Sequence, residues 1–339
     1  MPAGPPACSD AERRAARAHG AALRAAGWTT RTDALWVRPA WPAVLGVLAT
    51  TGVVASVVSA DHATVGLVIA ATAFVLALAE LGPWPVLRRL VTFARATQNV
   101  VAEPHRLRTA AAPPPRVTLV LVAAVDGPRG GLAQRARIPV RAITTGALGL
   151  VALAATARVA LDASGVLVGA LQLVPTAVLV LALGALADAA IAAPAPAPGG
   201  DPPADVAVAA ARMLAAVPLR HVGLEIVLAG AGALGRRAFF RRDRRPSEAV
   251  AVAHVGSAAE TRFATAHPTL RAAAEASGLA ERHGRAPRAG RRPAIAVAGS
   301  AAGAGAFLVA LARGLDEALA QAGPGPQPAS SERFAKSTK

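Results

Sequence analysis

The chain has 339 residues, room for about two domains, and its 54% hydrophobic residues and mean hydropathy of +0.43 direct the search to membrane spans first. Its single cysteine, Cys8, excludes an intramolecular disulfide and a zinc site made of several thiolates. The net charge of +16 comes almost entirely from arginine, but aromatic residues make up only 3% and tyrosine is absent, so no nucleic-acid partner is expected.

The first 38 residues predict a helix followed by an edge strand. Ser9 and Glu12 have the spacing of a capping box, in which a hydroxyl and a carboxylate accept the free amide hydrogens at a helix start. The alanine- and arginine-rich run behind them continues to Gly27, a residue type that commonly ends a helix. Residues 28–38 then favour a strand. We expect residues 1–38 to belong to a cytoplasmic domain.

Two long uncharged runs follow, at residues 39–60 and 63–79, and only Asp61 and His62 separate them. Runs of this length suit helices that cross a bilayer, so we expect a transmembrane hairpin within residues 39–84. A hairpin buried in a protein core is the alternative. Core helices seldom stay apolar on every face, which favours the membrane.

Residues 85–139 return to water and carry the first segment of a sheet. Residues 93–102 predict a strand. The run VTLVLVAAVDGPRGG, at residues 117–131, is continuous, rich in valine and closed by turn residues. This pattern is typical of a strand buried on both faces at the centre of a mostly parallel sheet. Asp126 would then stand at the carboxyl end of the strand, where open α/β sheets place their ligands.

A second transmembrane hairpin is predicted within residues 140–192, from uncharged runs at 142–157 and 163–187. Its first helix is short unless the long side chain of Arg158 extends to the interface. Of the 36 lysines and arginines, all except Arg158 fall within residues 1–40, 82–141 and 201–339. By the positive-inside rule, we expect a multi-pass protein of the cell (inner) membrane with both termini in the cytoplasm and the lipid bilayer as a partner.

The remaining residues alternate between helix and strand patterns. Residues 193–203 form a stiff linker of proline and alanine, and residues 323–339 form a polar tail that we expect to be disordered. Between them, residues 204–322 predict helices at 204–216, 234–242, 268–281 and 305–322, and strands at 222–229, 249–255 and 293–299. The fold class is therefore α/β, with a mixed, mostly parallel sheet flanked by helices and two inserted transmembrane helical hairpins.

Three segments of this framework suggest a family. ATQNVVAEP (residues 96–104), LVLVAAVDGPRGG (119–131) and RHVGLEIVLAGAGALGRRAFFRR (220–242) resemble segments of the di-zinc aminopeptidases of metallopeptidase family 28. The opening run at residues 12–27 is similar to the first helix of those enzymes. The resemblance implies a mixed sheet flanked by helices. It also implies two zinc ions that activate a water molecule to attack a peptide bond.

The metal pattern of that family is degenerate in this chain. Where the family ends its central strand with His-x-Asp, Ala124 replaces the histidine and Asp126 keeps the orienting carboxylate. The residual family positions are Asp126, Asp201, Asp205 and His254, and the degenerate positions are Ala124, Gly232, Ala233 and Ala253. A catalytic zinc needs about three protein ligands. We therefore expect neither zinc nor another cofactor, and no catalytic residue is assigned.

The sequence thus predicts a catalytically defective pseudopeptidase that binds or scaffolds a peptide or a membrane-protein partner. The first alternative is an active zinc-dependent aminopeptidase with an altered metal site near Asp126, Asp205 and His254. The second is a small transporter, which would need polar groups on the facing sides of the spans. The spans contain few such groups.

Six arginines crowd residues 236–245, where they could contact anionic lipid headgroups. A solvated helix end is an equally good interpretation of this run. The predicted lipid-facing basic cluster consists of Arg236, Arg237, Arg241, Arg242, Arg244 and Arg245.

Overall fold

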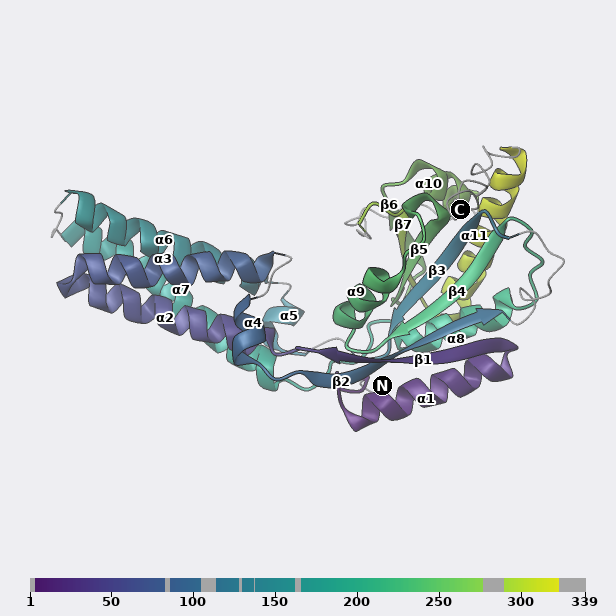
Figure 1. The fold of residues 1–339 in the computed structure, drawn as a ribbon, viewed down its shortest axis with the longest axis horizontal. Coiled ribbons are helices and arrows are strands. Elements are labelled where there is room, and N and C mark those ends of the chain that lie inside the picture. The colour runs from purple at the N-terminus through teal and green to yellow at the C-terminus, as the bar shows by residue number, and fades with distance from the viewer. Residues whose placement is uncertain are drawn as a thin grey trace, which may run out of the picture.

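A computed structural model of the chain describes residues 4–82, 86–104, 114–127, 130–136, 138–161, 166–276 and 290–322. Within these ranges the chain forms two parts, which Figure 1 shows side by side. One is a seven-stranded sheet with its covering helices, here called the α/β unit. The other is a bundle of four long apolar helices that extends away from one end of the sheet. The predicted tail at 323–339 lies outside the described residues.

The described strands form one sheet in the order β1-β2-β4-β3-β5-β7-β6. In chain order, the strands are β1 (Trp28–Val37), β2 (Arg95–Pro104), β3 (Val117–Ala124), β4 (Val222–Ala229), β5 (Val250–Ser257), β6 (Arg262–Thr265) and β7 (Ala294–Gly299). β3 lies between β4 and β5 and is parallel to both, with Leu121 opposite Ile226 and Ala253. The prediction of a central strand that starts at Val117 is confirmed.

The sheet is mixed, but the expectation that it is mostly parallel is wrong. Of the six pairings among the described strands, β1 with β2, β2 with β4 and β6 with β7 are antiparallel. β6 was not predicted, because four residues are too few to show an alternating pattern. β1 and β2 pair along their whole length, from Trp28 opposite Pro104 to Val37 opposite Arg95. The first apolar hairpin is therefore inserted at the turn of a β-hairpin.

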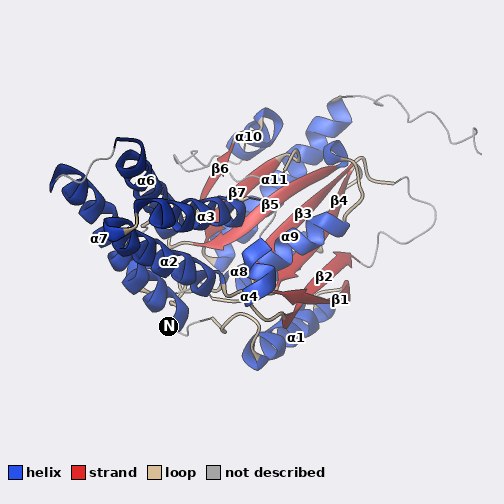
Figure 2. Ribbon diagram, turned by 60° about the vertical axis from the view of Figure 1, so that its left-hand side comes forward, coloured by secondary structure: helices blue, strands red, loops and turns tan. Residues whose placement is uncertain are grey.

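Helices cover the two faces of the sheet unequally. α1 (Asp10–Ala25), α8 (Pro203–Leu214), α10 (Pro268–Glu275) and α11 (Ala301–Gln321) pack on the face that carries Leu119 and Leu121. α9 (Ala233–Arg242) lies on the opposite face, where Phe239 packs against Val120 and Val122. Figure 2 shows α9 in front of the sheet and α11 behind it. The face under α9 therefore has the thinner cover.

Two of these helices differ from the predicted bounds. α10 ends at Glu275, and residues 277–281 of the predicted helix lie outside the described residues. α11 begins at Ala301 rather than at residue 305, because Ser300 caps it by accepting a hydrogen bond from the amide of Gly303 at 3.2 Å. Gly305 lies inside the helix, where a Cβ would lie 2.7 Å from the sulfur of Met213 on α8. The glycines here permit close helix packing.

The four apolar helices are α2 (Trp41–Asp61), α3 (Ala63–Leu81), α6 (Val140–Leu161) and α7 (Val166–Ile191). α2 and α6 each contact both α3 and α7, which gives an up-down-up-down four-helix bundle. α6 has 22 residues and is not short, because Arg158 is accommodated in its last turn, where a basic side chain suits the helix dipole. The short helices α4 (Val86–Val91) and α5 (Leu132–Arg135) lie at the end of the bundle nearest the sheet, here called the sheet-proximal end.

The bundle buries many small residues at its helix contacts, together with some large ones such as Leu148 and Leu179, and it leaves many other large apolar side chains exposed. Ala49, Ala73 and Ala77 are at most 1% exposed. Val57, Leu153 and Leu181 are 66%, 64% and 75% exposed. A hairpin in a water-soluble core would bury its large side chains, whereas small residues at helix contacts are typical of helices in lipid. All four helices are long and apolar enough to cross a membrane.

A polar network joins α2 to α7 inside the bundle. The side-chain amide of Gln172 donates to the carbonyl of Ser56 at 2.5 Å, to the hydroxyl of Ser56 at 2.8 Å and to the hydroxyl of Ser59 at 2.6 Å. The hydroxyls of Ser56 and Thr176 lie 2.6 Å apart. These groups bond mainly with one another, as polar groups that hold membrane helices together do.

Glu12 ties α1 to the turn between β4 and α9. It is completely buried, and its Oε2 accepts from the amides of Cys8 at 2.7 Å and Ala231 at 3.2 Å. The hydroxyl of Thr97 donates to its other oxygen. Ser9 accepts from the amide of Glu12 at 3.1 Å, so the capping box is confirmed, although Glu12 reaches back to Cys8 rather than to Ser9. Ala231 has a φ of 50°, a strained value for alanine that these contacts help to hold.

We expect Glu12→Ala to lower the free energy of unfolding of the α/β unit by about 3 kcal/mol, because each buried donor left without an acceptor costs roughly 1–3 kcal/mol. Thermal unfolding followed by tryptophan fluorescence measures this. Glu248→Ala is the control, since among the described residues this exposed carboxylate accepts a hydrogen bond from the neighbouring hydroxyl of Ser247 and from no other group. Equal effects of the two variants would contradict the anchoring role.

In the bundle, Gln172→Leu should lower the stability of the helices by roughly 1–2 kcal/mol, the range found for hydrogen bonds between membrane helices. Heat-induced aggregation of the detergent-purified protein gives the measurement. Thr72→Val is a matched control, because the exposed hydroxyl of Thr72 bonds only to the carbonyl of Val68 on its own helix. A wild-type midpoint for Gln172→Leu would mean that the network does not hold α2 to α7.

Candidate functional site

The carboxyl ends of the parallel strands face the sheet-proximal end of the bundle. This follows from where the two apolar hairpins are inserted: one between β1 and β2, the other after the carboxyl end of β3. β2 is antiparallel to β4, so its first residue, Arg95, also lies toward the carboxyl end of β4. The edge at which α/β sheets place their ligands is therefore covered by the ends of the apolar helices.

A cavity of about 780 Å³ lies at this edge and is here called the edge cavity. The sheet side contributes the ends of β3 and β5 and the start of α9. The bundle side contributes the ends of α2, α3, α6 and α7. Apolar groups dominate the lining, and its charged side chains among the described residues are those of Asp126 and Arg141.

The structure brings together four of the predicted site positions. Ala124, Asp126, Gly232 and Ala233 all line the edge cavity. A Cβ at Gly232 would lie 3.2 Å from Oδ1 of Asp126, which places the carboxylate beside the start of α9. Ala253 does not line the edge cavity. It is completely buried in the core on the face of the sheet that carries Leu119 and Leu121. The described residue of β5 that reaches the cavity is Ser257.

The other three residual positions do not line the edge cavity, and their side chains have different partners. Asp201 accepts a hydrogen bond from the amide of Ala301 at 3.0 Å, at the start of α11. Asp205 on α8 forms an ion pair with His19 of α1 at 3.5 Å. His254 lies under α9, where its Nδ1 is 3.3 Å from the guanidinium of Arg236. Each of these three side chains thus has a local partner of its own.

The zinc ions that the sequence resemblance implies do not fit this arrangement. Across the described ranges, no three His, Cys, Asp or Glu side chains come close enough to hold a metal ion. Ala124, Gly232 and Ala233 supply no donor atom where the family would place one, and Asp126 is the one carboxylate that the described lining offers. A catalytic zinc needs about three protein ligands and an open position.

Sequence reasoning missed three residues of the edge cavity. Arg141 lies with its guanidinium 3.9 Å from the ring centre of Trp41, a cation–π contact at the start of two apolar helices. Ser257 accepts a hydrogen bond from the amide of Gly199 at 2.9 Å. Tryptophan and arginine flanking apolar runs are typical of membrane interfaces, and this signal could have found Trp41 and Arg141. Ser257 has no such signal.

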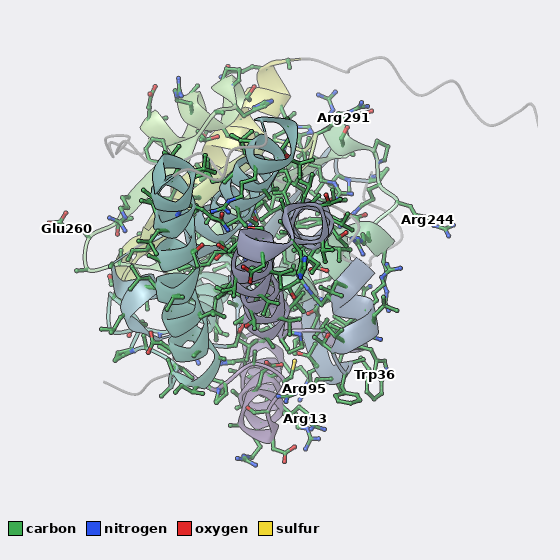
Figure 3. The ribbon with its side chains drawn as sticks, turned by 90° about the vertical axis from the view of Figure 1, so that its left-hand side faces the viewer. Arg13, Trp36, Arg95, Arg244, Glu260 and Arg291 are labelled. Atoms are coloured by element: carbon green, nitrogen blue, oxygen red, sulfur yellow. The ribbon has the colours of Figure 1, made fainter. Side chains whose placement is uncertain are left out.

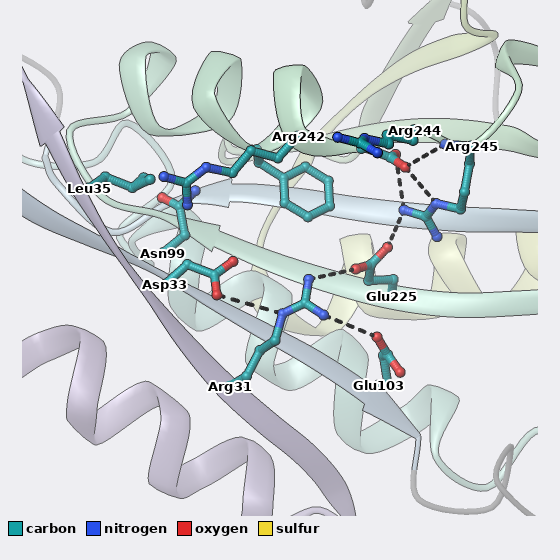
Figure 4. A pocket seen from close by; sticks show the side chains of 11 residues that line it. Arg31, Asp33, Leu35, Asn99, Glu103, Glu225, Arg242, Arg244 and Arg245 are labelled. Carbon is teal, nitrogen blue, oxygen red and sulfur yellow. Dashed lines mark hydrogen bonds and ion pairs between the residues drawn. The ribbon is translucent and has the colours of Figure 1, made fainter.

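The predicted basic cluster divides between two sides of α9. Arg236, Arg237 and Arg241 lie toward the bundle. Arg242 and Arg244 line a smaller pocket of about 330 Å³ on the other side, drawn in Figure 4. Arg245 lies between the two sides and lines both cavities. It forms ion pairs with Glu225 at 2.5 Å and with Asp243 at 2.9 Å. These six side chains therefore do not form one surface.

The pKa values of the two carboxylates next to Arg245 are shifted in opposite directions. Burial raises the pKa of Glu225, although the charge of Arg245 and its hydrogen bond oppose the shift. Burial would also raise the pKa of Asp243. Hydrogen bonds from Arg245, together with the charges of Arg245 and Arg292, outweigh burial and lower it. Arg245 is therefore the main cationic partner of two nearly buried carboxylates, because it lowers the pKa of Asp243 and opposes the rise in the pKa of Glu225.

Removing that partner should be costly at neutral pH. We expect Arg245→Ala to reduce the free energy of unfolding by about 2–3 kcal/mol. Breaking a fully buried ion pair costs roughly 3–5 kcal/mol, and the cost should be smaller here because Arg245 is 36% exposed. Arg244→Ala, one residue away and exposed, should change it by less than about 0.5 kcal/mol. Thermal unfolding of both variants gives the comparison.

The pH dependence of the same variants provides a second check. Asp243 has a lowered pKa in the folded protein, so its contribution is present above its ordinary pKa of about 4 and is lost as the pH falls through the folded value. The difference between the wild type and Arg245→Ala should therefore shrink as the pH falls through this range. A difference that is constant with pH would show that packing, and not charge, makes Arg245 important.

Comparison with known proteins gives a likeness to a solved structure but none to a protein family. No protein-family model and no curated protein matches the chain. Among solved structures, the chain is similar to a zinc aminopeptidase from Bacillus subtilis, BSAP, with 9% sequence identity and a TM-score of 0.44. The alignment covers 90% of this chain and 89% of the enzyme.

Proposed function

We propose that the chain is a multi-pass protein of the inner membrane whose α/β unit lies in the cytoplasm and acts by binding rather than by hydrolysis. It would be a pseudopeptidase that holds a peptide or an apolar segment of a membrane-protein partner. The edge cavity is the proposed binding site. The observation that carries the proposal is the lining of that cavity, where the positions expected to bind metal are occupied by alanine and glycine.

The shape and chemistry of the cavity support a peptide or apolar segment as the occupant. About 780 Å³ is within the usual range for a ligand pocket, and an apolar lining with a few polar groups is typical of such pockets. Asp126 and Arg141 provide one charge of each sign, and Ser257 provides a hydroxyl. These groups could orient the backbone or a terminus of a bound segment.

The proposed orientation rests on the residues at the sheet-proximal end. Trp36, Leu90 and Phe93 are 75%, 76% and 90% exposed there, and Arg88 and Arg89 lie on α4 beside them. Exposed aromatic and aliphatic side chains next to arginines suit the boundary between headgroups and water. Because nearly all basic residues lie on this side of the spans, the positive-inside rule favours the cytoplasm for the α/β unit.

Metal content and peptide cleavage test the proposal against the hydrolase alternative. The full chain, purified in detergent and exposed to zinc before dialysis, should retain far less than one zinc per chain by elemental analysis. The same sample should release no amino acid from aminopeptidase substrates. Zinc near one or two per chain, together with cleavage, would support an active enzyme with an altered metal site instead.

Binding itself can be measured with labelled apolar decapeptides by fluorescence anisotropy. Ala233→Phe should weaken their binding by about tenfold, because it fills space in the edge cavity. Ala272→Phe is the control, at an exposed position of α10 outside the cavity. Equal affinities for the two variants would place the peptide elsewhere, and no binding by the wild type would contradict the proposed occupant.

A further inference from the structure

A second, larger cavity lies next to the edge cavity and differs from it in charge. It has a volume of about 950 Å³ and is here called the arginine cleft. Its walls are α9, the end of β1, the segment around Arg291, and the sheet-proximal end of the bundle with α4. Among the described residues, ten arginines line it, and the only carboxylate in the lining is that of Glu80.

Some of these arginines are already neutralised or engaged. Arg88 forms an ion pair with Glu80 at 3.0 Å. Arg245 and Arg292 both pair with Asp243, at 2.9 Å and 3.3 Å. The one carboxylate of the cleft lining is therefore used within the protein, and it leaves no negative charge to balance the remaining arginines.

Arg38 of the cleft donates to the backbone carbonyls of Arg89 and Thr92 and has no carboxylate partner among the described residues. The same absence of a carboxylate partner holds for five more arginines of the cleft: Arg89, Arg236, Arg237, Arg241 and Arg291. Arg236 and Arg237 are consecutive on α9. Burial, and to a lesser extent the adjacent charge of Arg237, lower the pKa of Arg236. A cation held in a partly buried position normally has a counter-charge. Of the five, Arg236 is the partly buried one, and no carboxylate among the described residues supplies its counter-charge. The other four are exposed beside it and remain available to an anion.

His254 adds an independent sign that a partner is missing. Because the guanidinium of Arg236 can only donate, Nδ1 of His254 accepts and its Nε2 carries the hydrogen. Burial and the charge of Arg236 lower the pKa of His254 to about 4, so the ring is neutral at pH 7. Its Nε2 is buried and has no hydrogen-bond partner among the described residues. The lining of the cleft thus contains, beside its guanidinium groups, a neutral histidine whose buried N–H has no partner among the described residues.

We propose that the arginine cleft binds a phosphate-bearing anion, held by Arg236 and Arg237 from α9 and by Arg89 and Arg291 from the facing walls. Guanidinium groups donate two parallel hydrogen bonds to phosphate oxygens, and a phosphate can accept from several walls at once. This site is separate from the proposed peptide-binding function, since it uses the arginine cleft and not the edge cavity.

Two sources of the phosphate fit the position of the cleft. Arg88, Arg89 and the exposed Trp36 place it at the proposed level of the lipid headgroups. Figure 3, viewed from the bundle end, shows Trp36, Arg244 and Arg291 on one side of the molecule and Glu260 on the other. A phospholipid headgroup could enter from the bilayer, and a soluble phosphorylated molecule could enter from the cytoplasm.

Binding of two probes to the full chain in neutral detergent tests the proposal. Inorganic pyrophosphate, followed by calorimetry, represents a soluble phosphate. Dioleoylphosphatidic acid, followed by the rise in unfolding temperature relative to dioleoylphosphatidylcholine, represents a headgroup. The double variant Arg236→Gln/Arg237→Gln should weaken binding by about tenfold or more, because it removes two charge-assisted contacts.

The control double variant is Arg242→Gln/Arg244→Gln, which removes the same charge from side chains that line the smaller pocket of Figure 4. It should change the affinity by less than about twofold, because it lowers the overall positive charge of the protein but leaves the side chains proposed to contact the anion in place. Arg89→Gln/Arg291→Gln tests the facing walls at two exposed positions and replaces the first variant if that variant does not fold.

The possible outcomes distinguish a soluble phosphate from a lipid headgroup, and both of these from the absence of a phosphate site in the arginine cleft. Pyrophosphate binding that depends on Arg236 and Arg237 supports the site with a soluble ligand. Stabilisation by phosphatidic acid alone, with the same dependence, supports it with a lipid headgroup. Absence of binding by both probes, or equal weakening by the cleft and control variants, overturns the proposal. None of these results depends on whether apolar peptides bind the edge cavity.

Discussion

The carboxyl edge of the sheet faces the end of an apolar helical bundle across shared cavities, and the rest of the architecture depends on this placement. Both hairpins leave the sheet at the same edge, one from the turn between β1 and β2 and the other after β3. The outward-facing valines and leucines of the bundle favour a lipid environment. The position of the bundle then determines where the attached sheet lies. The ligand edge of an α/β fold is thereby turned toward the proposed membrane surface.

This position explains the contrast between the two cavities. The edge cavity is closed by the ends of apolar helices and has an apolar lining, with Asp126 in place of a set of metal ligands. The arginine cleft opens beside it, at the thinly covered face under α9, and collects basic side chains from both parts of the molecule. The carboxylates near α9, Glu225 and Asp243, form ion pairs with Arg245 and do not neutralise the other arginines of the cleft. The separation of charge follows from the packing of α9 over the sheet.

Local signals in the sequence were enough to predict most elements but not the sites. The unbroken apolar run of β3 identifies a central strand, and the spacing of Ser9 and Glu12 identifies a helix start, because both depend on neighbouring residues. β6 is too short to recognise, and Arg158 concealed the full length of α6. The contact between Arg236 and His254 depends on how α9 lies across β5, which no local pattern encodes. The meeting of the bundle with the sheet is likewise a matter of tertiary packing.

The insertion of the first hairpin between two paired strands also sets an order of assembly. β1 is synthesised before α2 and α3, but its partner β2 follows them, and β2 in turn pairs with β4, which comes after the second hairpin. The sheet therefore cannot close until both hairpins have been made. During synthesis, β1 has no partner until the first hairpin has been made, and β2 has no β4 until the second has been made, and long-range pairing of this kind is slow. Membrane insertion would then precede folding of the α/β unit, so that the bundle serves as the template on which the sheet is completed.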